Sequence, residues 1–134
     1  MNQRQWQDIV GALRDAADMN RSVDAAAALQ SMASREDVPR LLELLEDDDL
    51  VVRAAAAWPL SDLGVVEAIP AIVRAKHRGT DEGDDNDSLN AALADLVSMN
   101  AEAASPVVRA LTESTDPRLR DTGEWLLEFC GPRA

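Results

Sequence analysis

The chain has 134 residues, of which 25 are acidic and 13 basic, so its formal net charge at pH 7 is −12. This length fits one domain with a continuous core, and the acidic balance disfavours binding to nucleic acid or to an anionic membrane surface. Tyrosine is absent, phenylalanine occurs once, and the aromatic and β-branched runs typical of strands are missing. We therefore expect an all-α protein.

Helical periodicity begins near the N-terminus. A first helix is expected over residues 5–17, with an apolar face made of Trp6, Ile9, Val10 and Leu13. A second helix is expected to end near residue 33, and either Asn20 or Ser22 can cap its first turn. Its apolar face is predicted to consist of Val23, Ala26, Ala27 and Leu29.

Residues 36–63 predict one complete helical hairpin, with Ser34 in front of it and Gly64 after it. The apolar stripe of the first helix is Val38, Leu41, Leu42 and Leu45. The stripe of the second helix is Val52, Ala55, Ala56, Leu60 and Leu63. A polar break of three aspartates, residues 47–49, separates them. One hairpin cannot bury both stripes alone, so stacked neighbours are required.

The second half of the chain predicts two further hairpins. An outer helix is expected over residues 65–76, and residues 78–87 form an acidic surface loop without apolar residues. Leu89 resumes the helical period. Another outer helix is expected over residues 101–112, and Asp116 followed by proline starts a last helix that runs to about Cys130.

Overlaying the hairpins reveals a repeat. Prolines fall in the first turn of three outer helices, at Pro39, Pro70 and Pro106. Two inner helices carry an aspartate and an arginine four residues apart, Asp49 with Arg53 and Asp116 with Arg120. The inner helix between them has two asparagines at these positions, Asn86 and Asn90. We therefore expect one domain, residues 1–134, with approximate units 1–33, 34–64, 65–100 and 101–131.

This pattern resembles HEAT repeats of the short bacterial type related to phycobilisome-lyase repeats. The resemblance rests on VPRLLELLEDDDLVVRAAAAWPLSDLG, with weaker matches in IPAIV…SLNAALADLV and SPVVRALTESTDPRLRDTGEWLLEF. It implies a right-handed α-solenoid of about four hairpins whose second helices line a concave surface. It also implies a scaffold or binder with hydrogen bonds between neighbouring repeats, formed by Asp49, Arg53, Asp116 and Arg120.

Two tryptophans share one position of their repeats and lie off the apolar stripe of their helices. On a helical wheel, Trp58 falls almost opposite the stripe, and Trp125 takes the equivalent position in the last helix. Rigid aromatic side chains and carboxylates suit contact with a basic chain. The candidate partner-binding residues are Trp58, Asp62, Asp95, Met99, Asp121, Glu124, Trp125 and Glu128. Alternatively, the tryptophans pack between adjacent inner helices.

Catalytic, metal and cofactor sites have little support, and none is predicted. His77 is the only histidine, near the expected end of an outer helix, where a cation suits the helix dipole. Cys130 is the only cysteine and aligns with a core position, so a small buried role is expected. The acidic loop fails the EF-hand pattern, because Gly83 and Ala92 stand at ligand positions.

Together these features favour a non-enzymatic module that binds a basic protein through an acidic, tryptophan-bearing concave face. The most concrete form is an immunity or inhibitor protein for a basic toxin or enzyme, a monomer when free. The alternative is an accessory or lyase-like repeat protein that acts on a chromophore or prosthetic group of a partner enzyme. The lone cysteine and the lack of signal-like or membrane-spanning apolar runs predict a cytoplasmic location, with no nucleic-acid or membrane partner.

Overall fold

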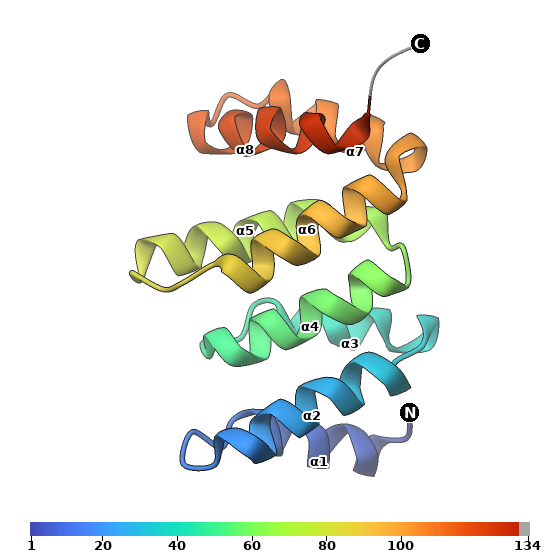
Figure 1. Ribbon diagram of the computed structural model, residues 1–134, viewed down its shortest axis with the longest axis vertical. Coiled ribbons are helices and arrows are strands. Elements are labelled where there is room, and N and C mark those ends of the chain that lie inside the picture. The colour runs from blue at the N-terminus through green and yellow to red at the C-terminus, as the bar shows by residue number, and fades with distance from the viewer. Residues whose placement is uncertain (132–134) are drawn as a thin grey trace. The chain divides into compact units, whose positions relative to one another are not determined.

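The computed structural model describes residues 1–131, which form eight α-helices and three short 3₁₀-helices without a β-strand (Figure 1). The all-α, hairpin-repeat fold predicted from the sequence is therefore confirmed. The chain divides into two compact units, Met1–Leu63 and Gly64–Ala134.

The first unit contains two helical hairpins, α1 (Gln3–Leu13) with α2 (Met19–Met32) and α3 (Val38–Leu44) with α4 (Leu50–Asp62). The 3₁₀-helix η1 (Arg35–Asp37) leads into α3. The inner helices α2 and α4 contact each other, as Figure 1 shows. The core is made of leucines and small residues, among them Leu13, Leu29, Leu41, Val52, Ala56 and Leu60.

The start of α2 differs from the sequence prediction. Asp18, rather than Asn20 or Ser22, caps this helix by accepting a hydrogen bond from the Arg21 amide. The core side of α2 consequently carries Ala25 and Leu29, whereas Val23, predicted to be on the apolar face, has 63% of its surface exposed. Several oxygen-bearing side chains in a row can cap a helix, so packing decides which one does.

The end of α4 is held by side chains that precede it in the chain. The Gln30 amide donates to Asp62 at 2.8 Å, and the Arg35 guanidinium donates to the Leu63 carbonyl at 3.1 Å. Gly64 then adopts a φ of +68°, a conformation that side chains rarely tolerate. A glycine after the helix is thus required at this point, as the sequence indicates.

The second unit contains α5 (Ile69–Asp81) with α6 (Asp87–Met99) and α7 (Ala101–Thr112) with α8 (Pro117–Leu127). The 3₁₀-helices η2 (Val66–Ala68) and η3 (Glu128–Cys130) extend α5 and α8. The bounds of α7 match the predicted range. Asp116 caps α8 through the Arg118 amide, and Pro117 is its first residue, as predicted.

Two predictions for the second unit are wrong. The acidic loop predicted over residues 78–87 is shorter, because α5 continues to Asp81 and α6 begins at Asp87. An ion pair between Arg78 and Glu82, four residues apart at 2.9 Å, supports this extra turn. Pro106 lies inside α7 and not in its first turn, because the helix already starts at Ala101.

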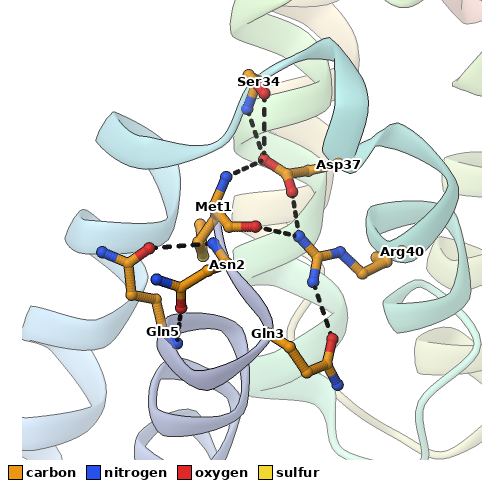
Figure 2. A network of polar contacts seen from close by, with 7 residues as sticks. All are labelled: Met1, Asn2, Gln3, Gln5, Ser34, Asp37 and Arg40. Atoms are coloured by element: carbon orange, nitrogen blue, oxygen red, sulfur yellow. Dashed lines mark hydrogen bonds and ion pairs between the residues drawn. The ribbon is translucent and has the colours of Figure 1, made fainter.

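A polar network joins the start of α1 to the second hairpin (Figure 2). The buried Asp37 carboxylate accepts a hydrogen bond from the Ser34 amide at 2.9 Å, pairs with Arg40, and lies 3.8 Å from the Met1 ammonium. The Arg40 guanidinium in turn stacks 4.3 Å from the Trp6 ring centroid. Asp37 stands where a capping box has its acid. Its carboxylate therefore caps a helix and also connects the first hairpin to the second.

This network predicts a pH dependence. Burial alone would raise the pKa of Asp37, but the Ser34 amide and the Arg40 guanidinium outweigh it and hold that pKa below 3.8. A folded-state pKa below the unfolded one gives stability that is present above about pH 4 and is lost as the pH falls through the folded pKa. We expect Asp37→Asn to cost about 2 kcal/mol at pH 7.

Urea denaturation between pH 2 and pH 7, followed by circular dichroism, measures this effect. The difference between the wild type and Asp37→Asn should shrink towards the acid end of this range. The matched control is Asp8→Asn, an exposed carboxylate on α1. An equal difference at every pH would contradict the assigned role.

Candidate functional site

In the first unit, the predicted site residues lie on one face of α4. Trp58 is half-buried and Asp62, one turn later, is exposed. Val51, at the other end of the same face, is 46% exposed, and Met19 on the neighbouring α2 is 76% exposed. The face is therefore apolar along most of its length, with the Gln30–Asp62 hydrogen bond at one end.

In the second unit, α6 and α8 carry exposed carboxylates. Asp121 and Glu124 lie on α8 and Glu128 begins η3, at a spacing that places them on one side of this continuous helical segment, and all three are exposed. On α6, Asp95 is exposed, and Met99, one turn later, is 81% exposed. None of these four acids forms an ion pair with a cation in the described part of the chain.

Trp125 has an aromatic neighbour and a cationic neighbour. Its half-buried ring has Phe129 at its edge, with ring centroids 5.2 Å apart and an interplanar angle of 79°. The Lys76 ammonium from α5 lies 5.0 Å from the Trp125 centroid. Within the second unit, Trp125 therefore contacts the outer helix α5, and its role as a groove residue or in packing between inner helices stays a prediction.

His77 does not lie at the end of an outer helix, where the sequence suggested a cation suited to the helix dipole. It lies inside α5, is 8% exposed, and its Nε2 is 2.9 Å from the Thr122 hydroxyl of α8. Burial lowers the pKa of His77, and the nearby cations Arg118 and Lys76 lower it further. The imidazole is therefore neutral at pH 7 and serves as a helix-to-helix hydrogen-bonding group.

The hydrogen bonds of the repeated aspartate and arginine are local. Asp49 and Asp116 each cap their own inner helix, four residues before the arginine. Arg53 donates to the carbonyls of residues 47 and 48, and Arg120 to those of residues 114 and 115. For Asp49, Asp116 and Arg120, no hydrogen bond to a neighbouring repeat exists among the described residues. The bonds described for these three residues are therefore within their own repeats, and the inter-repeat ladder stays a prediction.

Other chemistry-bearing groups are dispersed. Cys130 is half-buried in η3, so its core role is only partial. No cluster of three or more His, Cys, Asp or Glu side chains suited to a metal ion occurs between residues 1 and 131. Over the same residues, every helix is too short or too polar to cross a bilayer.

Comparison with known families agrees with this architecture. A family model described as HEAT repeats matches residues 8–83, more than half of the chain. The chain belongs to the HEAT-repeat family. HEAT repeats generally mediate protein–protein interactions, and they are typically non-enzymatic scaffolds. No curated protein and no solved structure shows a significant match.

The HEAT-repeat structure thus places the predicted residues in three local groups. Trp58 and Asp62 share a face of α4, Asp95 and Met99 share one of α6, and the acids of α8 form a row. Sequence reasoning missed the contact of Lys76 with Trp125 and the buried state of His77. The one sequence feature that sets Lys76 apart is that it is the only lysine of the chain.

Proposed function

We propose that this HEAT-repeat protein binds a basic protein through the exposed faces of its inner helices. The observation that carries the proposal is a row of exposed carboxylates that form no ion pair among the described residues, namely Asp121 and Glu124 on α8 and Glu128 at the start of η3. Exposed acids without internal cations are available to lysines and arginines of a partner, and they accelerate its association. Asp95 on α6 adds a further unpaired acid.

Apolar side chains on the inner helices supply the contact area that charges alone do not provide. Met99 is 81% exposed next to Asp95, and Trp58 with Val51 gives α4 an apolar face that ends at Asp62. Large exposed apolar groups among polar ones are typical of interaction surfaces. In its most specific form, the proposal is that the protein is an immunity or inhibitor protein for a basic toxin or enzyme.

A charge-reversal experiment tests the proposal. The tagged protein is incubated with native-host lysate, and captured proteins are identified by mass spectrometry. We expect a basic partner whose affinity falls at least about tenfold in the triple variant Asp121→Lys, Glu124→Lys, Glu128→Lys, because attraction becomes repulsion. Affinity for the wild type should also fall with rising salt concentration.

The matched control reverses three acids on or next to the outer helices, Glu67, Glu102 and Glu113, which are also exposed. It changes the net charge by the same amount and should bind the partner with nearly wild-type affinity. A partner without excess positive charge, or equal losses in both triple variants, would overturn the proposal. Circular dichroism of each variant checks that the helices are retained.

A further inference from the structure

Exposed large apolar side chains gather on the inner helices of the first unit. Between residues 1 and 131 there are five such side chains, and three of them lie on α2 and α4. Met19 and Val23, one turn apart on α2, are 76% and 63% exposed, and Val51 at the start of α4 is 46% exposed. Single apolar side chains scattered over a surface are normal, whereas a group on two neighbouring helices indicates a site of contact.

The two helices lie side by side in a fixed register. They contact each other and run in the same direction (Figure 1). The Gln30 side chain of α2 donates to Asp62 of α4, 32 residues later, and the same offset brings Val51 level with Met19. Helical spacing then gives one continuous apolar surface, here called the α2–α4 strip, which consists of Met19, Val23, Ala26, Val51, Ala54 and Trp58.

The border of the α2–α4 strip is acidic. Asp18 and Asp62 lie at its two ends, and Asp24 lies along α2 and is exposed. None of these three carboxylates forms an ion pair with a cation in the part of the chain that the structure describes. Arg21, the arginine of α2, already pairs with Asp15 at 3.0 Å. The strip is therefore complementary to apolar side chains that are bordered by lysine or arginine.

We propose that the α2–α4 strip binds an amphipathic helix of a partner protein, with an apolar stripe flanked by lysines or arginines. An extended segment would need backbone donors and acceptors from the surface that it covers, but the strip offers side chains of two complete helices. A helix satisfies its own backbone groups and lays its apolar stripe on such a surface. From Met19 to Gln30 the strip is about 16 Å long, which matches three turns of helix.

A second copy of this chain is a poor occupant, because two chains of net charge −12 repel each other. The inference rests on the proposed function, since it specifies which element of a basic partner the first unit would bind. It adds a requirement that charge alone does not impose, namely that the partner's apolar residues follow helical spacing.

Synthetic peptides of about 14 residues test the inference with the full-length protein, by fluorescence anisotropy of a label on the peptide. The first peptide has leucines at helical spacing along one face, with lysines on both sides. The second has the same composition in an order without a stripe, and the third keeps the stripe but has glutamates for lysines. We expect the first peptide to bind at least about tenfold more tightly than either of the others. A central proline in the first peptide should weaken its binding at least about fivefold, because it interrupts the helix.

Two matched substitutions on α2 locate the binding site. Met19→Gln removes an apolar side chain of the strip, and Met32→Gln makes the same change at an exposed methionine on another side of the helix. Glutamine is nearly as good a helix former as methionine, so both proteins should keep their circular dichroism. We expect Met19→Gln to weaken binding of the first peptide at least about threefold, and about tenfold when Val23→Gln is added. Met32→Gln should change it less than about 1.5-fold.

Several outcomes would overturn the inference. Equal affinity for the striped and the reordered peptide would reduce the contact to charge, and equal affinity for the proline peptide would exclude a helix. A dimer of the free protein that dissociates in the Met19→Gln, Val23→Gln variant would make a second copy the occupant. Absence of peptide binding would overturn this inference alone, because the proposed function is tested separately by the charge reversal of Asp121, Glu124 and Glu128.

Discussion

Replacing Arg53 by alanine is expected to lower the free energy of unfolding by about 3 kcal/mol. The Arg53 side chain is fully buried, and its guanidinium donates to the carbonyls of Asp47 and Asp48 at 2.9 and 3.1 Å. Truncation leaves these carbonyls without their donor and opens a cavity of nearly a whole side chain. Urea denaturation followed by the helical circular dichroism signal measures the loss.

Arg120 is the matched control, because it occupies the same repeat position and makes the same type of bond while being exposed. Its guanidinium reaches the carbonyls of Ser114 and Thr115 at 3.2 and 3.4 Å. We expect Arg120→Ala to cost less than about 1 kcal/mol, since water replaces the lost donor. Similar losses in both variants would show that burial is not what makes Arg53 important.

The second large effect is expected from Gly123→Ala, at the contact between α7 and α8. A β-carbon at this buried position would lie 2.9 Å from the Leu111 β-carbon and 2.9 Å from the Thr112 backbone nitrogen. Backbone atoms cannot move aside as a flexible side chain can, so the two helices must separate. We expect a destabilisation of about 2–3 kcal/mol, measured as a lower urea midpoint.

Gly11→Ala is the control for the glycine substitution itself. Gly11 lies in the exposed part of α1, and a β-carbon there would meet no atom within 4 Å. Because alanine is the better helix former, this change should stabilise the protein by about 0.5–1 kcal/mol. Opposite signs for the two variants are therefore expected, and a stabilised Gly123→Ala protein would contradict the close helix packing.

The sequence predicts the helices well where apolar spacing decides the structure. Val52 and Leu60 are buried as predicted, and α7 has the predicted bounds. It predicts them less well where several local signals compete. Asp18, Asn20 and Ser22 are all suitable caps, and residues 78–82 can form either a loop or a further helical turn with an Arg78–Glu82 ion pair. The sequence alone does not decide between such local choices.

The candidate site also contains features that the sequence predicts and features that it does not. The exposure of Asp121, Glu124 and Glu128 follows from the helical wheel, because positions opposite a core stripe face solvent. The environment of Trp125 does not, since Lys76 comes from another helix far away in the sequence. A helical wheel describes one helix only. It does not indicate which side chain of a neighbouring hairpin will contact that helix.

The two hydrogen bonds that hold the end of α4 have a consequence for the order in which the protein forms during synthesis. Gln30 and Arg35, the donors to Asp62 and the Leu63 carbonyl, both precede their acceptors in the chain. These bonds therefore require no residue after Gly64. Since N-terminal segments leave the ribosome first, the first unit can complete its own helix ends while the second is still being made.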